Sequence, residues 1–256
     1  MKILVCIKEV PDSEGTIRIN DSCRRIDVEG PYRMNRFDEF ALEEALRIGE
    51  KMPVQSIDTL SVGPARAEST IRKGLEMGAS RGIHILREES DDISAFETAS
   101  LIASFARNEG YNLILTGVMA EDDMRSQVGP MIAEILGYPS ASSVIHEEID
   151  PEGGMLFAER EIEGGMRECL EMKLPALLTI QSGINRPRYP ALSNVLRARN
   201  QEITTIPSPT LQQPEKREQI ARLRYPETPS KGIVLGGNER EKARALIGIL
   251  HEQSIL

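Results

Sequence analysis

The sequence contains no tryptophan, and aromatic residues make up only 4% of its 256 residues. Apolar residues still account for 40% of the chain, so we expect an aliphatic core of Leu, Ile, Val, Ala and Met. A chain of this length is sufficient for one large domain that carries extensions.

Cysteine and histidine are also scarce. The cysteines, Cys6, Cys23 and Cys169, are odd in number and form no CxxC motif, which is typical of reduced thiols in a cytosol-like compartment. The three histidines lie far apart in the sequence and show no spacing typical of zinc ligands. The sequence therefore predicts no disulfide framework and no metal site.

Basic residues are outnumbered, and the net charge of −9 argues against a nucleic-acid partner. No apolar run approaches the roughly 18 residues that a membrane helix needs. The first residues, MKILVCIKEVPD, contain a short apolar run without the features of a signal peptide. We therefore expect a cytoplasmic protein that does not insert into membranes.

The first 140 residues alternate apolar runs with helical patterns. The apolar runs at 2–8, 57–62, 83–86 and 113–116 are expected strands, and 38–51, 64–78, 93–109 and 128–136 are expected helices, with Asp38 as the N-cap of the first. This alternation predicts an α/β fold whose open, mainly parallel sheet is flanked by helices.

The pattern changes after residue 140. Short runs at 144–149, 155–162, 167–172 and 176–181 predict added antiparallel hairpins. After Gly183 the chain is rich in proline and is expected to be extended, with a helix only at 239–252. Such an arm is typical of a segment that packs on another protein. A free tail with a frayed helix is the alternative.

Three loops follow the ends of expected strands, namely Cys6-Ile7-Lys8 with Glu9, Ser61-Val62-Gly63-Pro64, and 117–129. Ligands of open α/β sheets bind at the carboxyl ends of the strands, and free amides at a helix start suit a phosphate. These loops predict a nucleotide site. The alternative is that Asp122 and Asp123 only cap the next helix. Neither GxGxxG nor GxxxxGK[ST] is present.

No catalytic constellation emerges from the sequence. A nucleophile elbow is missing, and no cysteine has a convincing histidine partner. Glu43 and Glu44 are interpreted as a solvated helix surface. We therefore expect no independent catalysis.

Residues 185–199, NRPRYPALSNVLRAR, are basic in an otherwise acidic chain. Tyr189 and Leu192 supply apolar groups beside four arginines, Arg186, Arg188, Arg197 and Arg199. Arginine and tyrosine are enriched at protein interfaces, so this segment predicts a docking surface. A solvated loop that balances the acidic surface is the alternative.

Residues 158–179, AEREIEGGMRECLEMKLPALLT, resemble the signature of electron-transfer flavoprotein β subunits. The matching positions are Arg160, Glu163-Gly164-Gly165, Glu168, Leu170, and Pro175 before Leu177-Leu178-Thr179. The segments VCIKEVPD, MNRFDEFALEEALRIGE and SVGPARAESTIRKGLEMGASRGIHI also resemble this family. The resemblance extends to about Ile206.

This resemblance implies a heterodimer with a larger α subunit that binds the redox-active FAD. The β subunit binds AMP structurally, and the complex carries electrons from acyl-CoA dehydrogenase-type flavoenzymes to a downstream acceptor. The implied division is 1–184 for the nucleotide-binding domain, 185–206 for the recognition loop and following segment, and 207–256 for the arm on the partner subunit.

The resemblance also assigns site residues by position. The AMP site is implied to consist of Cys6, Ile7, Lys8, Asn35, Phe37, Ser61, Val62, Gly63, Asp122, Arg125, Ser126, Gln127 and Val128. The recognition loop is implied to dock through Arg188, Tyr189, Leu192, Arg197 and Arg199, with Leu192 as the apolar anchor.

Two departures leave alternatives open. Met124 and Arg125 replace an acidic and a small residue of the family, so a nucleotide other than AMP stays open. Gln127-Val128-Gly129-Pro130 resembles an electron-bifurcating branch that holds a second FAD instead of AMP. However, 91–97, DDISAFE, lack the glycine- and aspartate-rich stretch of that branch, which favours the simple carrier.

Functions of another class are an ATP-binding hydrolase or a stress-type nucleotide sensor. The hydrolase requires a Ser-Gly-Gly-type phosphate loop, which we do not find. The sensor would fold and dimerise without a long arm.

Overall fold

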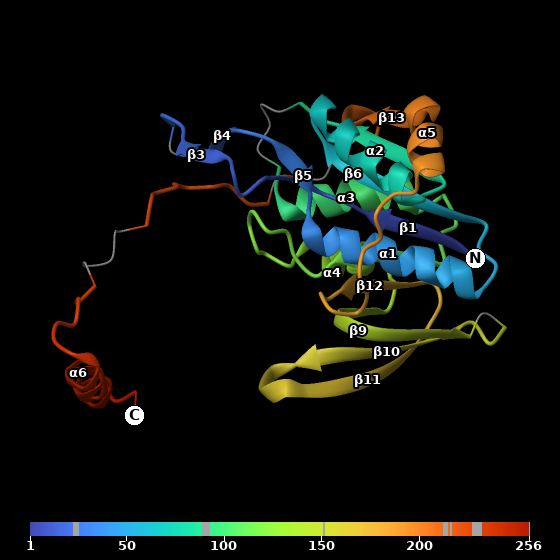
Figure 1. The fold of residues 1–256 in the computed structure, drawn as a ribbon. Helices are drawn as coiled ribbons and strands as arrows, with labels where there is room; N and C mark the ends of the chain where they lie inside the picture. Colours follow the sequence, from blue (N-terminus) through green and yellow to red (C-terminus); the bar gives the residue numbers. More distant parts are fainter. Residues whose placement is uncertain are drawn as a thin grey trace. The chain divides into compact units, whose positions relative to one another are not determined.

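The computed structural model describes residues 1–22, 26–88, 93–150, 152–211, 215, 217–226 and 232–255. Cys23, Asp91 and Asp92, which entered the predictions above, lie outside these ranges, as do Pro214 and Pro229 of the proline-rich region. The chain divides into two compact units, Met1–Ala221 and Arg222–Leu256 (Figure 1).

The first unit is built on a nine-stranded sheet with the order β11-β10-β9-β12-β8-β1-β6-β7-β13. All neighbours from β9 to β13 in this order pair in parallel, whereas β10 runs antiparallel to both β9 and β11. This arrangement confirms the predicted open, mainly parallel sheet. The strands are β1 Lys2–Cys6, β6 Ser56–Gly63, β7 Arg81–Leu86, β8 Leu113–Gly117, β9 Ser140–Asp150, β10 Met155–Ile162, β11 Met166–Lys173, β12 Ala176–Ile180 and β13 Ile203–Pro207.

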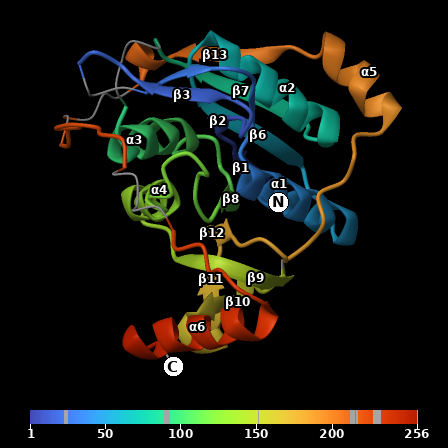
Figure 2. The same cartoon turned by 60° about the vertical axis from the view of Figure 1, so that its left-hand side comes forward.

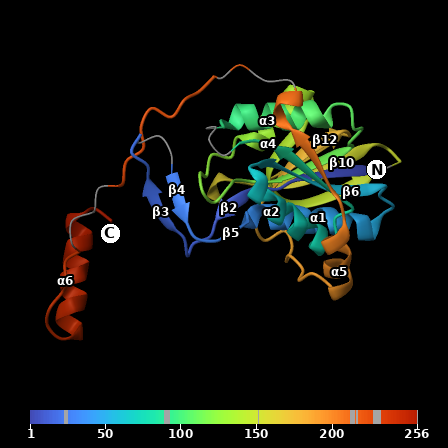
Figure 3. The ribbon, with the colours of Figure 1, turned by 90° about the horizontal axis from the view of Figure 1, so that it is seen from above.

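Helices cover both faces of the sheet (Figure 3). Successive residues of a strand point to opposite faces, so Ile3 and Val5 of β1 join one core cluster and Leu4 joins the other. Helices α1 Arg36–Lys51 and α2 Glu68–Met77 pack on the first face, and α3 Ala95–Ala106 and α4 Val128–Leu136 pack on the second.

Helix boundaries follow local side-chain chemistry. Ser94 and Glu97 form a capping box at the start of α3, and Gly78 ends α2 with a φ of 136° that favours glycine. Helix α1 begins one residue after Asn35, which occupies the N-cap position. The prediction that Asp38 caps this helix was therefore wrong, because Asp38 is its third residue.

Two predictions for the chain after residue 140 were wrong in part. The β9–β10–β11 segment is antiparallel, as predicted, but β12 pairs in parallel with β8 and β9. The region after Gly183 is not wholly extended, because α5 Leu192–Asn200 and β13 are present. No proline lies between Pro190 and Pro207, so nothing in this stretch prevents a helix or a strand.

Smaller elements complete the first unit. Strand β2 Glu9–Pro11 pairs with β5 Tyr32–Met34, and β3 Thr16–Ile19 pairs with β4 Ile26–Glu29. The β3–β4 hairpin extends beyond the carboxyl ends of the parallel strands (Figure 3). Three short 3-10 helices are η1 Ala65–Ala67, η2 Glu163–Gly165 and η3 Ser208–Thr210.

The second unit contains α6 Glu239–Glu252, whose boundaries confirm the helix predicted at 239–252. Asn238 and Glu241 form a capping box at its start. Leu246 and Ile247 are each 49% exposed. Across the described residues, no helix is both long and apolar enough to cross a membrane.

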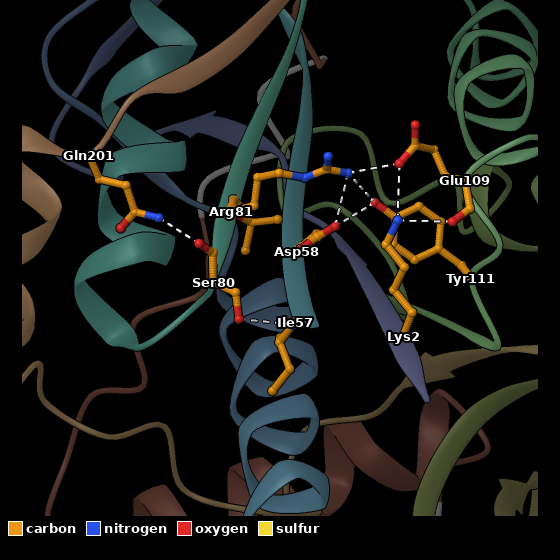
Figure 4. Close-up of polar contacts among 9 residues, drawn as sticks. Lys2, Ile57, Asp58, Ser80, Arg81, Glu109, Tyr111 and Gln201 are labelled. Carbon is orange, nitrogen blue, oxygen red and sulfur yellow. Dashed lines mark hydrogen bonds and ion pairs between the residues drawn. The ribbon is translucent and has the colours of Figure 1, made fainter. Parts of the chain in front are cut away.

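A polar network lies at the amino ends of the strands, opposite the predicted ligand site (Figure 4). The Tyr111 hydroxyl donates to the buried Asp58 carboxylate at 2.8 Å, and the Arg81 guanidinium lies 3.1 Å from the same oxygen. Arg81 and Lys2 both contact the Glu109 carboxylate, at 2.9 and 3.0 Å. The network therefore joins the starts of β1, β7 and β8 to β6.

Candidate functional site

The strand order places a topological switch point between β1 and β8, and we call the region outside the carboxyl ends of these two strands the crevice. The chain passes from β1 to β6 on one side, and β8 is added later on the other side. The connection that leaves β1 and the connection that leaves β8 therefore run to opposite sides. Open α/β sheets bind ligands where two such connections diverge. The structure brings the three predicted loops to this edge, at the left of the sheet in Figure 1, where β1, β6 and β8 end.

Asp38 joins the ends of the two strands that border the crevice. Its carboxylate accepts the Lys8 amide at 2.7 Å and the Gly117 amide at 2.9 Å. Burial raises the pKa of Asp38 to about 7, although both amide hydrogen bonds favour the charged form. A Cβ at Gly117 would lie 2.5 Å from the Asp38 Oδ1 and 2.6 Å from the Phe37 Cβ, so only glycine fits there.

Asn35 fixes the loop that follows β8. Its side chain, in a residue only 1% exposed, donates to the Met119 carbonyl at 2.9 Å and accepts the Glu121 amide at 3.1 Å. The Asn35 backbone amide also donates to the Lys8 carbonyl at 2.8 Å. Asn35 and the half-buried Phe37 are thus placed at the crevice with the strand ends.

The two aspartates of this loop bind Lys8. The Lys8 Nζ lies 2.7 Å from the Asp122 Oδ1 and 3.3 Å from the Asp123 Oδ2. Helix α4 begins after Gln127 without a side-chain cap. The interpretation of Asp122 and Asp123 as helix caps was therefore wrong, because their carboxylates bind the Lys8 side chain and α4 has no side-chain cap.

The start of α4 presents backbone amides to the crevice edge. Since α4 has no side-chain cap, its first amides are available to a ligand or to water. The Ser126 backbone is in the left-handed region, with a φ of 54°, and the Gln127 backbone is in the right-handed helical region. When one residue of each kind follows the other, successive backbone amides point to the same side of the chain, and this arrangement suits an anion. Gly129 lets α4 approach the sheet, because a Cβ there would lie 2.7 Å from Thr179.

The remaining predicted residues line the ends of β1 and β6. The Ile7 amide donates to the Leu60 carbonyl at 2.8 Å, and the Gly63 carbonyl accepts the Arg87 amide at 3.0 Å. The Ser61 hydroxyl is buried and has no hydrogen-bond partner within the described part of the chain. Burial, and then the charge of Asp38, raise the pKa of the Cys6 thiol, so Cys6 is not a thiolate nucleophile at neutral pH.

Other residues lie near the Arg125 side of the site and were not predicted. Arg125 lies 3.8 Å from Glu218, and the Arg217 guanidinium lies 4.2 Å from the centre of the Phe96 ring. Asp38 was expected only as a helix cap. Its contacts depend on β1 and β8 being neighbours, and no local sequence signal reports that.

The predicted docking residues lie on a separate surface, beside α1 and α2. Tyr189 and Leu192 are 97% and 74% exposed. Arg188 binds Glu43, Arg197 donates to backbone carbonyls of the α2 end, and Arg199 is exposed. Glu43 and Glu44 are 4% and 2% exposed, so their interpretation as a solvated surface was wrong.

No group of three or more His, Cys, Asp or Glu residues is arranged to hold a metal ion in the ranges that the structure describes. Cys6 is buried and Cys169 is exposed, and both are free thiols.

The strand order defines a doubly wound α/β protein whose topological switch point lies between β1 and β8. Residues 25–211 match the family model described as "Electron transfer flavoprotein domain". The electron transfer flavoprotein subunit beta of Homo sapiens is 37% identical over 209 residues, which cover 80% of this chain and 81% of that protein.

Relatives from other lineages agree with this match. The mitochondrial subunit beta of Arabidopsis thaliana is 37% identical over 204 residues, covering 79% of this chain and 80% of that protein. The subunit beta of Bradyrhizobium diazoefficiens is 35% identical over the same length and covers the same shares. The chain therefore belongs to the electron-transfer flavoprotein family.

Proposed function

We propose that this chain is the β subunit of a heterodimeric electron-transfer flavoprotein. It pairs with an α subunit that holds the redox-active FAD, accepts electrons from acyl-CoA dehydrogenase-type flavoenzymes and passes them to a downstream acceptor. The family match across 25–211, which includes both the crevice and the segment with Leu192, carries this proposal.

AMP is the proposed ligand of this chain, bound at the crevice between β1 and β8. The residues fit an adenine nucleotide in two respects. The uncapped start of α4 offers amides to a phosphate, and the buried Ser61 hydroxyl lacks a partner within the described residues. Asn35 and Asp38 hold the surrounding loops in place through hydrogen bonds to Lys8, Gly117, Met119 and Glu121.

The chain lowers no chemical barrier by itself in this proposal. The flavin supplies the redox chemistry, and the protein sets its position and surroundings. The raised pKa of Cys6 agrees with a role in binding, since a buried neutral thiol is a poor nucleophile.

A bifurcating subunit with FAD in place of AMP is the second candidate. One feature of the α4 start favours it, namely the sequence Gln127-Val128-Gly129-Pro130. The proposed cytoplasmic location also needs a test, because the name of the Arabidopsis thaliana relative includes "mitochondrial".

Co-expression of this chain with its α-type subunit tests these proposals. The purified complex is denatured, and the released nucleotides are identified by chromatography and mass spectrometry. One FAD and one AMP per heterodimer are expected for the simple carrier. Two FAD per heterodimer would favour the bifurcating subunit. A colourless homodimer that hydrolyses ATP would contradict both proposals and support the hydrolase.

A further inference from the structure

The segment that carries Tyr189 and Leu192 is fixed to the sheet unit at both of its ends. We call residues 184–200 the docking segment; it leaves β12, passes along α1 and ends in α5 beside α2 (Figure 1, Figure 2). Its apolar side chains are exposed to solvent, namely Tyr189 at 97%, Leu192 at 74% and Leu196 at 52%.

The first attachment is made by acidic residues of α1. The Glu43 carboxylate binds the Arg188 guanidinium in bidentate fashion, with distances of 2.8 Å to Nε and 2.9 Å to Nη2, and also accepts the Arg188 backbone amide at 3.1 Å. A planar guanidinium bound this way is fixed in orientation as well as in position. Glu50 adds one contact of 2.7 Å to Nη1.

A neighbouring carboxylate holds the chain just before Arg188. The Asn185 side-chain amide donates to the Glu44 carboxylate at 2.7 Å and to the Phe40 carbonyl at 2.9 Å. Glu43 and Glu44 are almost fully buried, so water competes little for these bonds. Exposed surface pairs would contribute far less.

The second attachment joins α5 to α2. The Arg72 guanidinium donates to the carbonyls of Ala198 and Gln201, and Arg197 donates to the carbonyls of Leu75 and Ala79 at 3.2 Å each. Two of the predicted docking arginines, Arg188 and Arg197, are therefore engaged inside this chain. Arg186 and Arg199 are exposed and form no ion pair with the described residues.

We propose that Glu43 is a positioning residue that holds Arg188 and thereby orients the exposed Tyr189 and Leu192 side chains for an apolar pocket on the donor flavoenzyme. This inference rests on the proposed docking function of the segment. It assigns Arg188 an internal structural role instead of a direct contact with the partner. The interface is then centred on apolar groups, with Arg186 and Arg199 at its margin.

Limited trypsin digestion of the purified heterodimer tests the attachment without any partner enzyme. Trypsin cleaves after arginine unless proline follows, so the Arg188–Tyr189 bond is a substrate and the Arg186–Pro187 bond is not. Glu43→Gln removes the carboxylate charge and is expected to speed cleavage at Arg188 at least about tenfold, because a released segment opens more often. Arg188→Lys keeps the cleavage site but loses the bidentate contact, and the same acceleration is expected.

Docking is measured as the rate of flavin reduction at 450 nm against the concentration of a medium-chain acyl-CoA dehydrogenase reduced with octanoyl-CoA. Leu192→Ala tests the proposed function, and we expect a KM about 5- to 30-fold higher. Glu43→Gln is expected to raise KM in the same direction, with kcat and bound flavin unchanged. Glu50→Gln is the matched control, since Glu50 is mostly exposed and leaves the bidentate pair intact.

The outcomes separate the two proposals. If Leu192→Ala leaves KM unchanged, the docking function and the positioning role both fail. If Leu192→Ala raises KM but Glu43→Gln does not, only the positioning role is overturned. Unchanged trypsin cleavage in both Glu43→Gln and Arg188→Lys would also overturn it, and thermal melting of each variant confirms that the fold is retained.

Discussion

At the scale of single residues, the buried acids of this chain differ in what they do. Glu43 and Asp38 have donors directed at them, from Arg188 and from two backbone amides. Glu147 on β9 is 3% exposed and faces Glu44 and Lys51 of α1. Burial and the nearby charge of Glu44 raise the pKa of Glu147 to about 7, with Lys51 opposing the shift.

This raised pKa predicts that the stability of the folded protein depends on pH. The folded protein holds the Glu147 proton more tightly than the unfolded chain, so the stability from this group is present at low pH and is lost as pH rises through about 7. Glu147→Gln keeps the neutral shape, and we expect its melting temperature at pH 8 to exceed that of wild type by about 2–4 °C or more. At pH 5 the difference should be much smaller, because most of the change falls between the ordinary glutamate pKa and about 7.

Glu148→Gln is the control, because the Glu148 side chain is 74% exposed. A melting curve for Glu147→Gln that shifts equally at pH 5 and pH 8 would show that the carboxyl does not titrate in this range.

Tyr111 offers a second test at the same scale. Its hydroxyl lies between the Asp58 carboxylate and the Arg81 guanidinium, at 2.8 and 3.2 Å, in a residue only 2% exposed. Tyr111→Phe removes a donor from a buried carboxylate, and we expect a loss of about 1–3 kcal/mol in the free energy of unfolding. Urea denaturation measures it, with Tyr189→Phe at a 97% exposed position as the control. An equal effect in both variants would contradict the role of the network.

At the scale of elements, the position of α4 depends on one glycine. A Cβ at Gly129 would lie 2.7 Å from Thr179 and 2.8 Å from Thr116, on β12 and β8. Gly129→Ala is therefore expected to displace the helix start, with a loss of about 1–3 kcal/mol in stability and a lower content of bound nucleotide. Denaturation and nucleotide release from the purified complex measure the two effects.

Gly248→Ala in α6 is the matched control, since a Cβ there would meet no atom of another part of the described chain within 4 Å. Alanine should stabilise that helix by about 1 kcal/mol, because glycine is the poorer helix former. Full nucleotide content and unchanged stability in Gly129→Ala would show that α4 does not need this close approach.

Elements were predictable where the signal is local. The apolar run of β1 and the Gly78 that ends α2 identify a strand and a helix end without knowledge of their neighbours. Helix α5 was missed because Pro187 and Pro190 dominated the interpretation of the residues that follow them. The orientation of β12 was missed because hydrophobic pattern is the same for parallel and antiparallel partners.

At the scale of the whole molecule, the described residues of the second unit leave apolar side chains of α6 half exposed. Leu246 and Ile247 project from one side of the helix, each 49% exposed. If this face packs on the α subunit, as proposed, Leu246→Glu combined with Ile247→Glu should reduce co-purification of that subunit at least about tenfold. Ala245→Glu, on the opposite side of the helix, should not. Equal recovery in both variants would contradict a role for this face.

The sequence by itself determined the alternation of strands and helices, the limits of α6 and the family, because these depend on residue types at fixed spacing. Only the tertiary structure decided that Asp38 joins the ends of β1 and β8 and that Glu43 holds Arg188. Glu43 and Arg188 are 145 residues apart. Whether such a carboxylate is solvated or bound depends on which distant segment packs against it, and no local sequence pattern contains that information.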